Sequence, residues 1–436
     1  MTLDRRLFLA TGLCALTRPA FARDPGREAL AREVLVTWHR LVLELVRHTA
    51  TYSPPVAARA FGYLGVVAHE TLAAMDPALR SLGGQLNGLA RPHVSEPQAD
   101  KALALHSALS DAAGVLFGNT GPMGQRAHGT MTARLGADLA TELDHETRTR
   151  SAALGQRITA HVLDWAAGDG GAEVANMGFA LDYTAGPRPE DWQPTSLIRQ
   201  QQAPLLPDWG RVRPFAMPAD AICGVALPPA YDTQPGSEFH SAALEVHEVT
   251  ARLTEEQKLI ARFWADPPML SPTPPGHWIA ILLDIADRDD LPVEPLAAAL
   301  ARLGAAQADA FIACWDAKYR YNLLRPVTYI RHHIDPDWTP LIETPPFPEY
   351  PSGHSTQSSA SATALSAIFG EDFAFEDRTH LGDGLPARHF PSFRAASEEA
   401  AMSRLYGGIH YRFGNEAGLA QGRCVGAYAA ALEMRA

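Results

Sequence analysis

The segment CWDAKYRYNLLRPVTYI, residues 314–330, carries two cations near the end of one expected helix. Lys318 and Arg325 are seven residues apart, and residues at this spacing lie on one helix face, two turns from each other. Pro326 disfavours helical geometry at the residue before it. We therefore expect Lys318 to project from a helix end and Arg325 from the following turn, both toward one point. Two cations at a helix C-terminus are, taken alone, also typical of a solvated helix end.

A second motif, FPEYPSGHS at residues 347–355, precedes a stretch with a helical pattern. Ser352 and Gly353 are therefore expected at or just before a helix N-terminus, where free backbone N–H groups and the helix dipole form an anion site. Glycine allows a close backbone approach, and Ser352 can cap the helix or donate a hydrogen bond. His354 is either an ordinary first-turn residue or a group that acts on the anion.

The third motif is SRLYGGIH at residues 403–410. Arg404 and His410 do not share a face of a regular helix, so they meet only if the helix bends or ends between them. Gly407 and Gly408 give the chain the means to do so. A lone histidine at such a position is more often a buried core residue than a ligand.

The three motifs together supply the donors of an oxyanion clamp, namely Lys318, Arg325, Ser352, Gly353 and Arg404, with His354 and His410 beside them. Such donors stabilise charge on the oxygens of a tetrahedral or trigonal-bipyramidal centre. One histidine can then bond the central atom while the other moves a proton. The formal net charge is −12, so local cations must attract the anion in spite of the protein's overall negative charge. The negative charge also argues against a nucleic-acid partner.

In this order, the three motifs resemble the signature of the type 2 phosphatidic acid phosphatase and vanadium haloperoxidase superfamily. The sequences that flank the motifs are most similar to those of its bacterial haloperoxidase-related branch. The resemblance covers roughly residues 311–424, with less specific similarity near 55–59 and 209–215. It implies an all-α fold of helical bundles around a vanadate or phosphate site, which agrees with helical patterns along most of the chain and with sparse strand signals.

The resemblance also implies roles for the clamp. The oxygens of vanadate or phosphate would be contacted by Lys318, Arg325, Arg404, Ser352 and the Gly353 amide. His410 would be the axial ligand of vanadium, or the nucleophile that takes a phosphoryl group. His354 would be the acid–base group that activates peroxide or protonates a leaving alcohol.

Further residues are candidates for the pocket. Trp315 and Phe347 lie where fungal chloroperoxidases carry aromatic residues beside the halide site, although plain core packing explains both equally well. A bromoperoxidase typically has histidine at the second of these positions. His277, in the sequence PPGHW, begins a predicted helix and is a weaker candidate.

One position departs from the family pattern. The family often has aspartate four residues after the axial histidine, where it holds the other ring nitrogen, but this sequence has Gly414. Loss of such a partner costs roughly 10–100-fold in affinity or activity. Asn415, Glu416 or a backbone carbonyl are the candidates to replace it.

The N-terminal sequence has the features of an export signal. Arg5 and Arg6 precede an apolar run, and the small residues Ala20 and Ala22 mark a cleavage site, as in a twin-arginine signal. An uncleaved N-terminal helix is the alternative. Export predicts a periplasmic or secreted protein.

Composition and pattern divide the chain into a signal (1–22), a helical region (23–165), a Pro/Gly/Trp-rich ordered loop (166–236) and a catalytic helical region (237–436). No segment has the ~18–20 uninterrupted apolar residues of a membrane span. The cysteines outside the signal are Cys223, Cys314 and Cys424. Their odd number and wide spacing favour small buried side chains over disulfides or a zinc site.

These observations favour an exported vanadate-dependent haloperoxidase that oxidises halide with hydrogen peroxide. A phosphatase of the same fold, acting on a phosphomonoester through His410, is the first alternative. A non-catalytic oxyanion-binding protein is the second.

Overall fold

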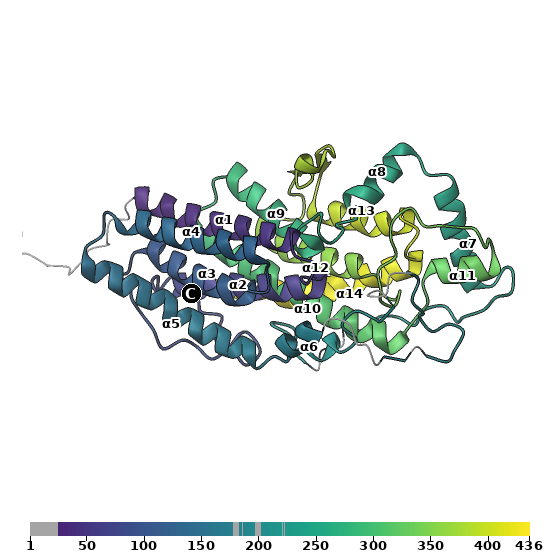
Figure 1. Cartoon of the computed structure of the whole chain (residues 1–436), viewed down its shortest axis with the longest axis horizontal. Helices are drawn as coiled ribbons and strands as arrows, with labels where there is room; N and C mark the ends of the chain where they lie inside the picture. The colour runs from purple at the N-terminus through teal and green to yellow at the C-terminus, as the bar shows by residue number, and fades with distance from the viewer. Residues whose placement is uncertain (1–24, 178–182, 185, 197–201, 220, 222) are drawn as a thin grey trace, which may run out of the picture.

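The computed structural model describes residues 25–436 apart from 178–182, 185, 197–201, 220 and 222 (Figure 1). The predicted signal therefore lies outside the described residues. Helices make up 60% of the structure and strands 3%, which confirms the all-α prediction. Figure 1 shows an elongated molecule, with the N-terminal helices at one end and α7, α8, α11 and α13 toward the other.

The N-terminal region packs α3 between α1, α2 and α5. Apart from α6, its described helices begin at prolines or after capping aspartates: Asp100 and Asp144 accept hydrogen bonds from backbone amides of α3 and α5. The described helices of this region are α1 (Pro25–Arg47), α2 (Pro54–Ala73), α3 (Lys101–Leu116), α4 (Pro122–Ala140), α5 (His145–Ala167) and α6 (Gly171–Met177).

The C-terminal region holds the three motifs. Its helices are α7 (Glu238–Ala251), α8 (Glu255–Phe263), α9 (Thr273–Arg288), α10 (Val293–Tyr321), α11 (Pro326–His333), α12 (Gly353–Phe369), α13 (Phe393–Tyr406) and α14 (Arg412–Ala430). A short antiparallel hairpin, β1 (Phe375–Asp377) with β2 (Arg388–Phe390), was not predicted, because its three-residue strands carry no alternating pattern. The short helix α11 was also missed.

The helix α10 is the centre of the fold. It is long and apolar enough to cross a membrane, but 89% of its most apolar stretch is buried inside the protein. It packs against α2, α12 and α14. The apolar character of α10 is therefore that of a core helix.

The helix α14 lies directly on α12, and three glycines make this approach possible. A Cβ at Gly418, Gly422 or Gly426 would lie 2.7, 2.2 or 2.7 Å from a backbone carbonyl oxygen of the motif that starts α12 or of α12 itself. Such distances are shorter than any side chain tolerates, so only glycine allows the backbones to come this close. The contact fixes α14 relative to the N-terminus of α12.

Where the structure describes the predicted irregular region 166–236, it has two short helices, α6 and the 3₁₀ segment η2 (Trp209–Arg211). Trp192 and Trp209 are buried. The Asp309 carboxylate of α10 accepts hydrogen bonds from the backbone amides of residues 215–217 at 2.5–2.8 Å. Burial raises the pKa of Asp309 to about 7, although these amides lower it. This carboxylate ties the loop to the central helix.

One prediction about the cysteines is wrong. Cys223 and Cys424 form a disulfide between the loop and α14, with their Cα atoms 5.6 Å apart. Their 201-residue separation gives no sequence signal, because the pairing exists only once the loop lies over the helix. Cys314 is free and buried, as predicted.

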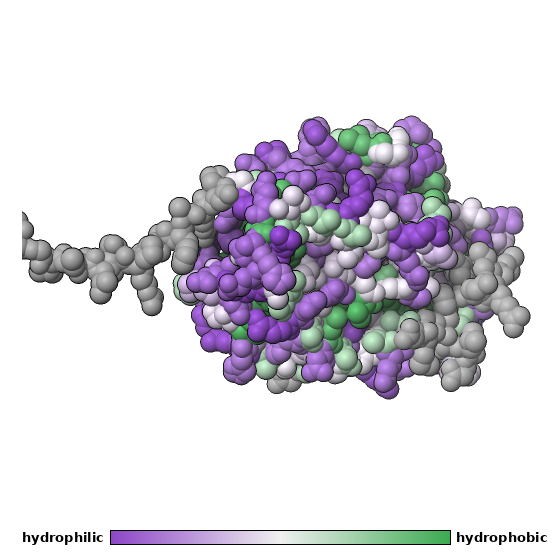
Figure 2. All heavy atoms as spheres, turned by 60° about the vertical axis from the view of Figure 1, so that its left-hand side comes forward, coloured by the Kyte–Doolittle hydropathy of each residue, from purple (hydrophilic) through white to green (hydrophobic). Residues whose placement is uncertain are grey.

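The surface at the N-terminal end is mostly hydrophilic. Figure 2 shows its apolar residues in small groups among polar ones. This distribution is ordinary for a folded domain, whose surface keeps scattered apolar side chains.

Candidate active site

The first motif places two buried cations at the junction of α10 and α11. α10 ends at Tyr321, and Asn322 adopts a left-handed conformation with φ of 51° that turns the chain. Arg325 is then the N-cap residue of α11. Lys318 and Arg325 are both fully buried, so the solvated helix end considered above does not apply.

Both cations are held from one side by backbone carbonyls. Lys318 Nζ donates to the carbonyls of Pro348 and Glu349 at 2.7 and 2.9 Å. Arg325 Nε donates to the carbonyl of Phe347 at 2.9 Å, and its Nη1 donates to that of Ile409 at the same distance. The loop before α12 therefore orients the two charged groups.

Trp315 and Phe347 lie beside these cations. The Phe347 ring centroid is 5.1 Å from Lys318 Nζ and 5.0 Å from Arg325 Cζ. The Trp315 ring is 4.9 Å from that of Phe347, and a Cβ at Gly353 would lie 3.5 Å from its edge. Phe347 is only half-buried, whereas Trp315 is fully buried. The two aromatic rings thus form a wall of the clamp, with Phe347 nearer the surface.

The second motif forms the N-terminus of α12. Ser352 is its N-cap and Gly353 its first residue, as the sequence predicts. The Ser352 hydroxyl accepts from the amide of Ser355 at a long 3.5 Å, so it remains available to another partner. His354 lies in the first turn, and its Nε2 is buried without a hydrogen-bond partner among the described residues. Burial and the charge of Arg404 hold the pKa of His354 well below its usual value.

The third motif joins α13 to α14 through a turn. α13 ends at Tyr406, and Gly408 has φ of 76°, a conformation that favours glycine. The Ile409 amide donates back to the Arg404 carbonyl at 3.2 Å. His410 therefore lies in the turn, next to the end of α13. This is the break that the paired glycines predicted.

His410 is held in one tautomer. Its Nδ1 donates to Glu349 Oε1 at 2.8 Å, and Arg325 Nη1 donates to its Nε2 at 3.0 Å. Burial, followed by the charges of Arg325 and the other clamp cations, holds the pKa of His410 well below its usual value. The ring is therefore neutral, and its Nε2 lone pair accepts the hydrogen bond from the clamp residue Arg325.

Glu349 occupies the place expected for the missing aspartate. It is fully buried, and its Oε1 also accepts from the Tyr411 amide at 3.1 Å. A Cβ at Gly414 would lie 2.3 Å from the same oxygen, so glycine at this position makes room for the carboxylate. The sequence had suggested Asn415, Glu416 or a backbone carbonyl, and none of these receives the Nδ1 proton.

No sequence pattern points to Glu349, although this residue lies inside the second motif. Burial raises its pKa to about 7, while the charges of Lys318 and Arg325 lower it. The orienting carboxylate thus comes from the loop before α12 instead of from α14.

Three buried nitrogen atoms at the clamp have no hydrogen-bond partner within the described part of the chain: Arg325 Nη2, Arg404 Nε and His354 Nε2. Arg404 is otherwise anchored through Nη1, which donates to the Trp264 carbonyl at 2.8 Å. Burial lowers the pKa of Lys318 to about 7, that of Arg325 to about 10 and that of Arg404 to about 9. Buried cations with unpaired N–H groups are costly unless an anion completes them. The donor set therefore fits a bound oxyanion such as vanadate or phosphate.

His277 does not line this clamp. It is fully buried, and its two ring nitrogens face Asp266 and Asp377 at 3.0 and 2.8 Å. Its ring stacks on Trp264 with centroids 4.6 Å apart. It is therefore behind the site, connected to it through the Trp264 backbone that binds Arg404.

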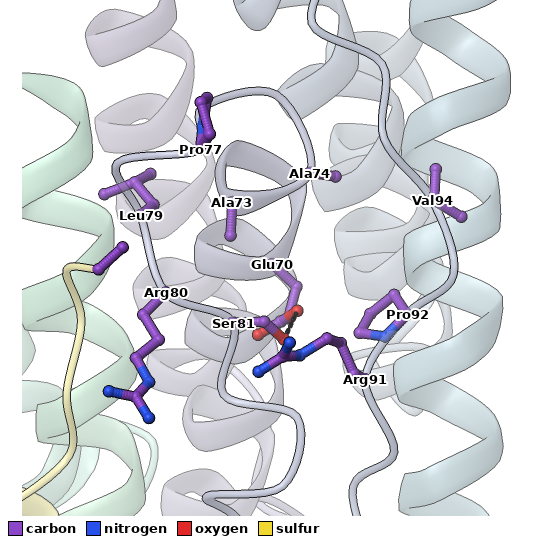
Figure 3. Close-up of a pocket in the computed structure, with 11 residues that line it drawn as sticks. Glu70, Ala73, Ala74, Pro77, Leu79, Arg80, Ser81, Arg91, Pro92 and Val94 are labelled. Atoms are coloured by element: carbon purple, nitrogen blue, oxygen red, sulfur yellow. Dashed lines mark hydrogen bonds between the residues drawn. The ribbon is translucent and has the colours of Figure 1, made fainter.

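A separate hollow of about 450 Å³ lies in the N-terminal half (Figure 3). It is lined by Glu70 and the arginines Arg80 and Arg91, between α2 and the loop that follows it. Glu70 already accepts hydrogen bonds from the Ser81 hydroxyl and the Leu82 amide. None of the predicted site residues lines this hollow.

Comparison with known proteins places this geometry in a family. A crystal structure described as the first bacterial vanadium-dependent iodoperoxidase matches with a TM-score of 0.84 and 35% identity, over 93% of this chain and 97% of that one. The chain belongs to the vanadium-dependent haloperoxidase family.

Two other matches agree with this membership. The family description "VCPO second helical-bundle domain" matches residues 298–436, which contain all three motifs. The holo form of a bacterial vanadium-dependent chloroperoxidase shares the fold, with a TM-score of 0.67 at 16% identity, over 88% of this chain and 92% of that one.

A fungal relative is more distant. The vanadium chloroperoxidase of Curvularia inaequalis is 28% identical over a match that spans 35% of this chain and 35% of that protein. The haloperoxidase family membership therefore rests on the bacterial relative that aligns over nearly its full length.

Proposed function

We propose that this chain is a vanadate-dependent haloperoxidase that oxidises halide with hydrogen peroxide. One observation carries the proposal: the neutral, buried His410 presents its Nε2 lone pair to buried cations whose remaining N–H groups have no protein partner. A neutral ring nitrogen and unpaired cationic N–H donors would hold a vanadate at this place.

The clamp residues divide this work. Arg325 Nη2 and Arg404 Nε would donate to vanadate oxygens, together with Lys318, the Ser352 hydroxyl and the Gly353 amide. His410 would hold the vanadate through Nε2. Bound vanadate would supply the Lewis acid that activates hydrogen peroxide toward two-electron oxidation of halide.

Two groups would handle protons and orientation. The unpaired Nε2 of His354 lies in the first turn of α12, and the lowered pKa of this ring leaves it neutral, so it can accept a proton from incoming hydrogen peroxide. Glu349 would fix the His410 ring and raise the basicity of Nε2 by accepting the Nδ1 proton.

The halide would approach along the aromatic wall. Phe347 is half-buried beside both Lys318 and Arg325, so a halide next to it would meet an apolar ring and two cations. Iodide is the first halide to test, since the bacterial relative of 35% identity is described as an iodoperoxidase.

The proposal includes export to the periplasm or the medium. It is supported by the arginine pair and apolar run at the N-terminus. The Cys223–Cys424 disulfide supports it as well, because disulfides persist in oxidising compartments. Fractionation of cells that produce the full chain tests this part.

The activity test uses purified protein with vanadate, hydrogen peroxide and iodide, followed by triiodide absorbance, and a phenolic dye with bromide. Turnover should require both vanadate and peroxide and should disappear in His410→Ala. His389→Ala is the matched control, since this histidine is 78% exposed on β2. Hydrolysis of p-nitrophenyl phosphate that vanadate only inhibits would instead identify a phosphatase. Vanadate binding with neither activity would identify an oxyanion-binding protein.

A further inference from the structure

Behind the clamp lies a second group of buried ionisable residues, which we call the Asp266 cluster. It consists of Asp266, His277 and His380 at its centre and of Asp377 and Asp383 outside them. These residues come from the segment after α8, the first turn of α9, strand β1 and the 3₁₀ segment η3 (Leu381–Asp383). The proposed haloperoxidase reaction assigns none of them a role.

In each histidine of the cluster, one ring nitrogen faces an outer aspartate and the other faces the central Asp266. His277 Nε2 faces Asp377 Oδ2 at 2.8 Å, and His380 Nδ1 faces Asp383 Oδ2 at 2.9 Å. The remaining nitrogens, His277 Nδ1 and His380 Nε2, face the Asp266 carboxylate at 3.0 and 3.2 Å. One atom from each of the three central residues lies within 4.8 Å of the other two.

This arrangement has the form of a metal site. A histidine that binds a metal usually gives its other ring nitrogen to a carboxylate, which fixes the tautomer and the ring orientation. Here both histidines of the cluster have such a carboxylate. Two imidazoles and one carboxylate are a donor set that suits divalent transition metals.

The charge balance of the cluster also calls for a cation. Asp266 and Asp377 are buried, and within the described residues their ion-pair partners are histidines alone. Without a metal ion, the contacts require both histidines to carry two ring protons. Burial lowers the pKa of His277, but the two aspartates raise it to about 10, so this protonated state is the competing one.

The two states differ in where the positive charge lies. Double protonation puts two cationic rings in contact, with the centroids of His277 and His380 only 4.9 Å apart. A single divalent ion supplies the same total charge at the Asp266 carboxylate and leaves both rings neutral. It also uses the two nitrogens that point toward that carboxylate.

We propose that Asp266, His277 and His380 bind one divalent transition-metal ion, with Asp377 and Asp383 orienting the two histidines. The site is separate from the clamp and does not depend on haloperoxidase activity. Its binding replaces one proton on each histidine, so no other reactant is needed.

The ion would support the clamp from behind. The Trp264 ring stacks on His277, and the Trp264 carbonyl accepts the hydrogen bond from Arg404 Nη1. Asp266, two residues further on, has φ of 44°, a left-handed conformation that is uncommon for residues other than glycine but that aspartate adopts more readily than most. A metal bond to this residue would hold the Trp264–Asp266 segment, and thereby Arg404, in place.

The test measures metal content in the full-length purified protein by inductively coupled plasma mass spectrometry, with vanadium counted separately. We expect about one transition-metal ion per chain in the wild type and in His389→Ala, and less than a tenth of that in His380→Ala. Asp383→Asn should keep the ligands but weaken Zn²⁺ binding roughly 10–100-fold.

A second measurement avoids variants that fail to fold. Wild-type protein stripped with a chelator is titrated with Co²⁺, which should give visible absorption bands that saturate at one equivalent and a raised melting temperature. Wild-type protein that is purified without a transition metal, gives no such bands and does not change its melting temperature overturns the proposal. In that case the cluster binds no metal ion, and both histidines carry two ring protons.

Discussion

The pairing of Glu349 with Gly414 leads to a test that moves the orienting carboxylate from one side of His410 to the other. Glu349→Ala removes the acceptor of the His410 Nδ1 proton, which lies at 2.8 Å in a fully buried site. A hydrogen bond to a buried charged group contributes about 1.5–3 kcal/mol. Vanadate affinity should therefore fall by roughly 10–150-fold, in the range expected for loss of an orienting partner.

Gly414→Asp alone should also be harmful. Its Cβ would lie 2.3 Å from Glu349 Oε1, and a second carboxylate would be buried beside the first. In the double variant, Glu349→Ala makes room and Gly414→Asp restores a carboxylate at the position usual for the family. We expect the double variant to bind vanadate at least tenfold more tightly than Glu349→Ala does.

The assay is a vanadate titration by calorimetry on all four proteins, with circular dichroism to check folding. A double-mutant cycle then gives the coupling between the two positions. If Glu349→Ala binds vanadate within threefold of wild type, or if the two substitutions simply add, the orienting role of Glu349 is refuted.

Three further predictions concern the clamp and the scaffold. Burial lowers the pKa of Lys318 to about 7, so the amine is charged below pH 7. Oxyanion affinity, measured by calorimetry, should therefore fall up to tenfold per pH unit above pH 7. Lys318→Gln should make this affinity less dependent on pH. Asp309→Ala leaves three loop amides without their acceptor and should lower the free energy of unfolding, measured by urea titration, by about 3 kcal/mol. The control is Asp316→Ala, because the Asp316 side chain is half-exposed on the same helix. It should change the free energy of unfolding by less than about 0.5 kcal/mol. Gly422→Ala places a Cβ 2.2 Å from an α12 carbonyl oxygen and should lower the melting temperature. The control is Gly129→Ala, whose added Cβ has no atom within 4 Å. It should leave the melting temperature unchanged or raise it.

The part of the site that local spacing determines could be predicted from the sequence. The seven-residue interval from Lys318 to Arg325, followed by proline, specifies a helix end and a turn, and the structure has both. Ser352 before a helical stretch specifies an N-terminus, and paired glycines before His410 specify a break. Each of these features depends on backbone rules that act within about eight residues.

The parts that the sequence did not reveal depend on tertiary contacts. Glu349 meets His410 across 61 residues, and Cys223 meets Cys424 across 201. His277 was only a weak candidate for the pocket, and its partner Asp377 comes from a hairpin 100 residues away. No local pattern reports such pairs, because they arise only when α9, α12 and α14 are packed together.

The most direct test of the account is a crystal structure of the protein grown with vanadate, at a resolution that separates the vanadium from its oxygens. We expect vanadium bonded to His410 Nε2, with Arg325 Nη2 and Arg404 Nε within hydrogen-bond distance of its oxygens and Glu349 still on Nδ1. Vanadium bound elsewhere, or an oxyanion in the clamp with no bond to His410, would contradict it.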